Sequence, residues 1–420
     1  MLKKIKRFFK KRSWLLLLFA CLVFIPQSFN YQSKLNMRVL VSGIAIDKAE
    51  SGYEVTAQVI MPTPGSESGG SGARLDFISE KGDSIAEGIQ KIAYKIGKTA
   101  GLSHTSFVMV GDSMLEENLA SSLDYFARDA KVNPSLMLLI CDGAAKEMIK
   151  GTKNLELSVG VGLQKVFIYK QSSLNALVIP LEEFINDSFG LAKSAMVGGI
   201  SIDPEDKEEE TKPSSQEQSS QGAELGGGSS SSSEEKNARI KFYNDIYYFK
   251  EGKYVNKMSD EKEILGVYLA ETFSNSGDFK LEHINDGMLN DATIGLSFTN
   301  KSNKVNIRFE NGKPILVLNI KIKDVQIVEI LNKDKPSVNL YDEQDEELLK
   351  IVKEKFSEKI EEYITKAFNK AKTDNVDIFN ISERAYQLDY KNWKKYQEEN
   401  GENFLKDATI EVNVKIVNIN

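Results

Sequence analysis

A long polar stretch, residues 204–236, constrains the fold of this 420-residue chain more than any other feature. It contains the runs EDKEEETK, SSQEQSSQ and GGGSSSSS and almost no apolar side chain. A segment that cannot bury apolar surface cannot offset the entropy of ordering its backbone, so we expect it to be disordered. It is either a tether between two domains or a long excursion from one sheet. The sequence therefore predicts four parts: an N-terminal signal or anchor segment at 1–36, a domain at 37–203, a Ser/Gly/Glu linker at 204–237 and a second domain at 238–420.

The composition is that of a folded globular protein. Hydrophobic residues make up 41% and charged residues 27%, which excludes a collagen, a disordered chain and a polytopic membrane protein. The two cysteines and two histidines are too few for a disulfide framework or a Cys/His zinc cluster. The net charge is −7 although the first 12 residues hold seven basic side chains and no acid. The rest of the chain is therefore strongly acidic, which argues against nucleic acid as a partner.

The N-terminus predicts export and attachment to a membrane. The basic residues precede an apolar run at 14–25, as in an export signal, and should stay on the cytoplasmic side. The sequence Leu18-Phe19-Ala20-Cys21 has the outline of a bacterial lipobox, which makes Cys21 a candidate for lipidation. The alternatives are an uncleaved anchor and ordinary cleavage. With either lipidation or an uncleaved anchor, the globular part lies outside the cytoplasmic membrane, with membrane lipid as a partner of the N-terminal segment.

Hydrophobic periodicity predicts an α+β protein with mixed sheets packed against helices. The first domain alternates strands with helices, which favours an α/β-like layer with parallel pairing. In the second domain, short strands, a hairpin at Asn311-Gly312 and one long helix predict an antiparallel sheet covered by that helix. The expected strands are 38–47, 53–61, 74–79, 104–110, 135–141, 195–202, 239–250, 279–284, 292–298, 304–310, 315–328 and 409–419. The expected helices are 83–99, 115–127, 143–150, 174–189 and 342–372.

No group of residues predicts a catalytic, cofactor or metal site. Gly97-Lys98-Thr99 resembles the end of a P-loop, but Ile92 stands where the first glycine belongs, and the motif ends a helix instead of preceding one. We therefore interpret Gly97 as a helix terminator. His104 could act as a general base, and the competing interpretation is a structural histidine.

The remaining polar and reactive candidates have structural interpretations. His283 is expected at the surface, and Cys141 as a small buried hydrophobe. Arg128 and Asp129 could hold a helix end by a salt bridge. Residues 377–379 (DIF) should anchor the chain in the core through Phe379.

Several short segments, in this order along the chain, are similar to the Ger(x)C family. These lipoproteins are the C subunits of bacterial spore germinant receptors. The matching segments are 41–47 (VSGIAID), 53–58 (YEVTAQ), 102–104 (LSH), 108–111 (VMVG), 123–129 (LDYFARD), 249–253 (FKEGK), 265–266 (LG), 271–272 (ET), 311–314 (NGKP), 377–379 (DIF), Trp393 and the terminal strand. The Gly/Ser loop at 65–72 and the linker look like additions, which indicates a divergent member.

The resemblance implies a non-enzymatic subunit without a cofactor. It implies anchoring on the outer face of the cytoplasmic (spore inner) membrane, integral membrane receptor subunits as partners, and a role in sensing small-molecule nutrients. Two alternatives stay open: an extracytoplasmic solute-binding or envelope-assembly lipoprotein unrelated to germination, and an envelope enzyme with His104 as its base.

Overall fold

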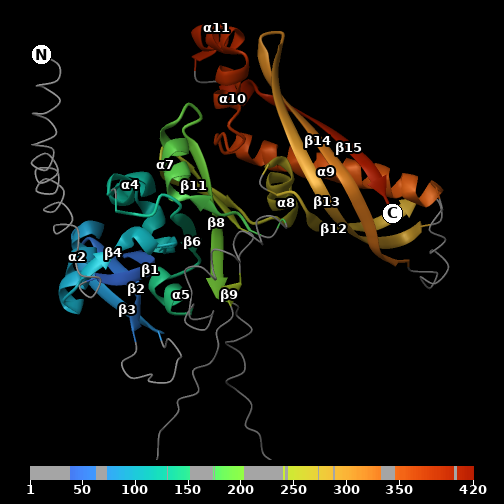
Figure 1. Ribbon diagram of the computed structural model, residues 1–420. Helices are drawn as coiled ribbons and strands as arrows, with labels where there is room; N and C mark the ends of the chain where they lie inside the picture. The colour runs from blue at the N-terminus through green and yellow to red at the C-terminus, as the bar shows by residue number, and fades with distance from the viewer. Residues whose placement is uncertain are drawn as a thin grey trace, which may run out of the picture.

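The computed structural model describes most of the chain outside the N-terminus and the polar stretch (Figure 1). The expected anchor at 1–36 with Cys21, and the expected disorder at 204–237, lie outside the described residues. The described residues are 38–62, 73–129, 131–151, 174, 176–202, 240–241, 245–272, 274–286, 289–332, 346–401 and 404–420.

A mixed sheet of 11 strands forms the first half of the molecule, in the order β11-β10-β8-β6-β5-β1-β2-β3 with three short strands attached. Its central pairs β1–β5, β5–β6 and β6–β8 are parallel, which confirms the predicted α/β-like layer. The strands are β1 (Arg38–Lys48), β2 (Tyr53–Pro62), β3 (Ala73–Gly82), β4 (Thr99–Gly101), β5 (Phe107–Val110), β6 (Met137–Cys141), β7 (Ile179–Pro180), β8 (Ser194–Ile202), β9 (Ile240–Lys241), β10 (Ile246–Lys250) and β11 (Lys253–Met258).

The last three strands of this sheet follow the polar stretch in the sequence. β9 and β10 both pair antiparallel with β8, which is the last strand before that stretch. β10 places Ile246 beside Gly198 and Phe249 beside Ala195. The chain therefore returns to the same sheet after residue 239.

Helices cover the first sheet. They are α2 (Ile85–Ile96), α3 (Leu119–Ser122), α4 (Asp124–Arg128), α5 (Ala145–Gly151) and α7 (Leu181–Phe189), with 3₁₀ turns at Leu102–His104 and Asp112–Glu116. The Ser84 side chain caps α2 by accepting the Glu87 N–H. Gly97 ends that helix in the left-handed conformation (φ 68°), as predicted.

Most boundaries in this half are shifted by a few residues from the predictions, and three differences have a clear local cause or place a singled-out residue elsewhere. The helix expected at 115–127 is broken, because the Asn118 side chain accepts the Ser121 N–H and starts α3 anew. The helix expected at 174–189 begins only at Leu181, since Ile179 and Pro180 are extended and pair with β6. The strand expected from 104 begins at Phe107, and His104 lies in a 3₁₀ turn.

A second sheet has the order β12-β13-β14-β15. Its strands are β12 (Gly277–Asp286), β13 (Leu289–Glu310), β14 (Lys313–Leu331) and β15 (Thr409–Ile419). Asn311 and Gly312 both have positive φ, so they form the tight hairpin turn that the sequence predicts. β15 pairs parallel with β14, a correction to the expected antiparallel sheet. Between these strands the described part of the chain forms four helices, and a crossover of this kind allows the next strand to pair in parallel.

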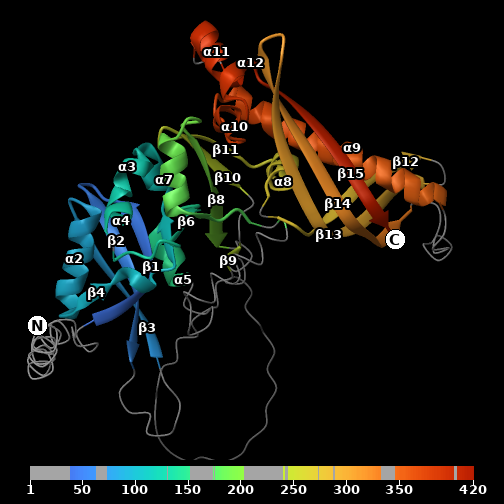
Figure 2. The ribbon, with the colours of Figure 1, turned by 45° about the horizontal axis from the view of Figure 1, so that its top comes forward.

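The long helix α9 (Glu346–Thr373) runs diagonally across this sheet, and α10 (Ile381–Leu388), α11 (Tyr390–Asn400) and α12 (Phe404–Asp407) lie near the β13–β14 turn (Figure 2). Phe356 of α9 packs against Phe279 and Phe298 of the sheet. A shorter helix, α8 (Glu261–Ala270), crosses α9 closely: a Cβ on Gly266 would lie 2.1 Å from the Tyr363 carbonyl oxygen. Only glycine permits this approach.

Candidate functional site

The structure places the reactive residues singled out in the sequence on different elements. His104 is exposed in its 3₁₀ turn, whereas Cys141 is fully buried at the end of β6. Burial raises the pKa of the Cys141 thiol well above its ordinary value. His283 is 81% exposed and contacts Asp291, with 2.7 Å between Nδ1 and Oδ1. The described part of the chain contains no cluster of three His, Cys, Asp or Glu side chains that could hold a metal ion.

Arg128 holds the end of α4 by a salt bridge, as predicted, whereas Asp129 takes no part in it. Arg128 pairs with Asp124, one helical turn earlier on α4, because side chains four residues apart share a helix face and adjacent ones do not. Asp129 instead accepts the Lys131 N–H at 3.0 Å and the Tyr125 hydroxyl at 3.3 Å. Both arrangements hold the local chain, and neither forms a ligand site.

The end of α9 is fastened to the first sheet by a polar contact centred on Asp374. The Asp374 carboxylate accepts hydrogen bonds from the Tyr248 hydroxyl of β10 and from Asn256 Nδ2 of β11 at 3.2 Å. It also pairs with Lys370 Nζ at 2.9 Å. Partial burial favours a higher pKa of Asp374, but the bonds from Tyr248 and Lys370 outweigh it and lower the pKa. Lys250 Nζ adds a bond to the Asn375 carbonyl oxygen at 2.9 Å.

Asp377 fixes the next turn of the chain from a fully buried position. Its carboxylate accepts the N–H groups of Ile381 and Ser382, both at 2.9 Å, at the start of α10. Its own N–H donates to Ser194 Oγ of β8 at 2.9 Å. Burial raises the pKa of Asp377, and the two backbone bonds oppose that rise. Phe379 packs against Phe368, so the predicted anchor exists and Asp377 strengthens it.

A buried lysine that the sequence analysis missed joins α8 to the second sheet. Lys301 of β13 is 5% exposed, and its Nζ donates to the carbonyl oxygens of Leu269 at 2.9 Å and Glu271 at 2.8 Å. The Asn303 amide donates to the same carbonyls at 2.9 and 3.0 Å. These carbonyls end α8, where they have no partner within the helix. Burial lowers the pKa of Lys301 to about 7, and the Glu271 carboxylate opposes that shift.

Carboxylates from both halves of the molecule interact electrostatically with one another and with this lysine. Burial raises the pKa of Asp187 on α7 to about 6, and the charges of Glu183, Glu271 and Glu383 add to the rise. Arg384 on α10 opposes the rise in the pKa of Glu271. Acidic side chains of α7 and α10 and the basic Arg384 and Lys301 therefore interact electrostatically at the junction between the two sheets.

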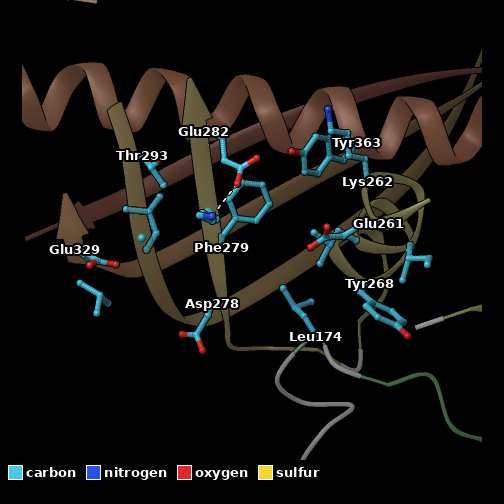
Figure 3. A pocket seen from close by; sticks show the side chains of 16 residues that line it. Leu174, Glu261, Lys262, Tyr268, Asp278, Phe279, Glu282, Thr293, Glu329 and Tyr363 are labelled. Carbon is cyan, nitrogen blue, oxygen red and sulfur yellow. Dashed lines mark ion pairs between the residues drawn. The ribbon is translucent and has the colours of Figure 1, made fainter. Parts of the chain in front are cut away.

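An open hollow of about 540 Å³ lies between α8, α9 and the second sheet (Figure 3). Tyr363 and Phe279 contribute rings, and Lys262 Nζ lies 5.9 Å from the centroid of the Tyr363 ring. Lys280 and Glu282 pair at 2.8 Å on its rim. The described residues that line it are a mixture of charged, polar and apolar side chains, and none of them is a Ser, Cys or His nucleophile.

Two family models match this chain in succession. The model described as "Spore germination protein N-terminal domain" matches residues 31–202, and the model described as "Spore germination B3/ GerAC like, C-terminal" matches residues 244–420. Together they span most of the sequence. The chain belongs to the GerAC family of spore germination proteins.

Individual relatives of this GerAC-family chain are distant. "Putative spore germination protein YfkR" of Bacillus subtilis (strain 168) is 24% identical over 131 residues, which cover 30% of this chain and 34% of that protein. The chain thus matches about a third of the length of this curated relative. The "Crystal Structure of the GerBC protein" aligns with 90% of this chain and 97% of that chain, at 15% identity and a TM-score of 0.46.

The GerAC-like motif at 41–47 builds the fold of the first sheet. Ser42 Oγ bonds Gln58 Oε1 at 2.8 Å in the interior. A Cβ on Gly43 would lie 2.2 Å from the Phe107 ring. The Asp47 carboxylate accepts the Ala145 N–H at 2.7 Å at the start of α5. Ser42 and Asp47 thus serve hydrogen bonding and helix capping, and Gly43 leaves room for the Phe107 ring.

Proposed function

We propose that this chain is a non-enzymatic, membrane-anchored subunit of a spore nutrient-germinant receptor and acts in germination by assembling with integral membrane subunits. The observation that carries the proposal is the match of the N-terminal and C-terminal GerAC models in order across both halves. The polar contacts between the halves also support it. Asp374 and Asp377 tie the end of α9 to β8, β10 and β11, a connection suited to a scaffold.

Anchoring is proposed from the sequence alone. Among the residues that the structure describes, no helix is long and apolar enough to span a membrane. The N-terminal segment carries the apolar run and Cys21. In spore membranes labelled with a fatty acid, wild-type protein should take up the label, Cys21→Ala should not, and the control Cys141→Ser should. If the wild-type protein takes up no fatty-acid label but still sediments with membranes, the lipidation hypothesis is wrong and the uncleaved anchor is favoured instead.

The germination role is tested with spores that lack this protein. Loss of the response to nutrients, with a normal response to a non-nutrient trigger, is the expected result. Normal responses to both triggers in a strain that also lacks its paralogues would contradict the proposal and favour a solute-binding or envelope-assembly role.

A further inference from the structure

One face of the second sheet has no covering layer among the described elements. Alternation along β13, β14 and β15 buries one set of side chains beneath α9 and turns the other set outward. The outward set near the hairpin is mostly polar. Its members are Ser302, Lys304, Asn306, Arg308, Glu310, Lys313, Ile315, Val317, Asn319, Lys321, Lys323, Thr409, Glu411, Asn413, Lys415 and Val417. We call this set the outer face.

The outer face is basic in an acidic protein. It holds six Lys and Arg side chains and two carboxylates, although the whole chain has a net charge of −7. Arg308 is paired with Glu310 and Glu411. Four exposed lysines of the outer face have no ion pair within the described residues. They are Lys323 and a group of three, namely Lys304, Lys321 and Lys415.

The three lysines lie close together because of the strand register. Lys321 and Lys415 are directly paired across the parallel strands β14 and β15. Lys304 lies on the same face two residues along the strands, since it pairs with Asn319, while Ser302 pairs with Lys321. Like charges at paired positions destabilise a sheet. The fold does not require this cluster, so an external anion is the natural counterpart.

The chemistry of the outer face favours a lipid surface over a protein. Protein interfaces are depleted in lysine and centre on buried aromatic or Arg anchors. The outer face has no aromatic side chain, and its central Val317 is only 8% exposed. Clusters of lysine beside a membrane are attracted to anionic phospholipids, with strong dependence on salt. We propose that the outer face of β13–β15 lies against an anionic phospholipid surface.

The proposal rests on the anchor in the proposed function, and the experiment separates the two. Full-length protein is reconstituted with vesicles of phosphatidylcholine alone or with added phosphatidylglycerol. Flotation tests the anchor in both. A membrane-impermeant amine-acylating reagent then measures the reactivity of each lysine by mass spectrometry. The reactivity of Lys304, Lys321 and Lys415 should fall about fivefold in the anionic vesicles, corresponding to about 1 kcal/mol per lysine, and recover in high salt.

Lysines on other surfaces serve as controls that show whether the outer face is the one that contacts the membrane. Lys353 and Lys391 are exposed on α9 and α11 and should react equally in both vesicles. Lys321→Gln with Lys415→Gln should abolish the protection of Lys304, whereas Lys353→Gln with Lys391→Gln should leave it intact. Equal reactivity of the three lysines in both vesicles, in protein that floats, would overturn the proposal. Protection only after addition of integral membrane subunits would also overturn it, in favour of an acidic protein partner.

Discussion

Lys301 should make the stability of this protein rise with pH in a range where most proteins change little. Its pKa is about 7 in the folded protein and 10.5 in the unfolded chain. Between these values the folded protein has released a proton that the unfolded chain retains. The unfolded state binds more protons, so the free energy of unfolding increases as the pH rises, and this gain is lost as the pH falls through about 7.

The magnitude follows from linkage. One proton of difference changes the free energy of unfolding by about 1.4 kcal/mol per pH unit, so the gain between about pH 7.5 and about pH 9.5 approaches 2–3 kcal/mol. Lys301→Met keeps the length of the side chain but cannot titrate. Asn303 still donates to the α8 carbonyls in this variant. Its stability should therefore lack this slope.

Urea unfolding of wild type, Lys301→Met and Lys304→Met across this pH range measures the effect. Lys304 is a matched control because it lies three residues along β13, on the opposite, exposed face. Lys304→Met should keep the wild-type slope. If Lys301→Met also kept it, the titration of Lys301 would not be its source, and our account of the buried amine would be wrong.

Four further substitutions test the packing, capping and surface assignments. Gly266→Val should lower the free energy of unfolding by about 3 kcal/mol, because the new side chain would clash with the Tyr363 carbonyl. Gly97→Ala has no atom within 4 Å of the new methyl group and should lower it by only about 1–2 kcal/mol, because of the positive φ. Similar urea midpoints for the two variants would contradict this difference. Asp377→Ala removes the acceptor of two buried N–H groups, should cost about 2 kcal/mol, and should expose α10 to limited proteolysis. His104→Ala should change the thermal midpoint little and leave germination intact, since the side chain is exposed; lost germination with an intact fold would restore a functional role for His104.

Local sequence patterns predict those strands and turns that are determined by neighbouring residues. The alternation at 409–419 gives β15 with the same bounds, and Asn311-Gly312 gives the turn between β13 and β14. Pairing beyond the next strand was not predictable from these patterns. The return of β10 to β8 across the polar stretch and the parallel pairing of β15 depend on the path of the whole chain.

The polar contacts at the junction were also hard to foresee. Asp377 was noticed only as the neighbour of Phe379, because its partner Ser194 is distant in the sequence. Lys301 left no such signal, because the sequence predicted one strand at 292–298 and another at 304–310, whereas the structure has the single strand β13 across both, with Lys301 at an inward position. Its acceptors are carbonyls at the end of α8, which the sequence analysis did not predict as a helix.

The central claim is that this chain works as one subunit of a receptor in the spore membrane. Its most direct test is affinity capture of tagged full-length protein from detergent-solubilised spore membranes, with quantitative mass spectrometry of what accompanies it. Our account predicts integral membrane germinant-receptor subunits in constant proportion to the chain, and their loss when spores carry an untagged copy instead. Recovery of the chain without any integral membrane subunit, under conditions that keep a known receptor intact, would contradict it.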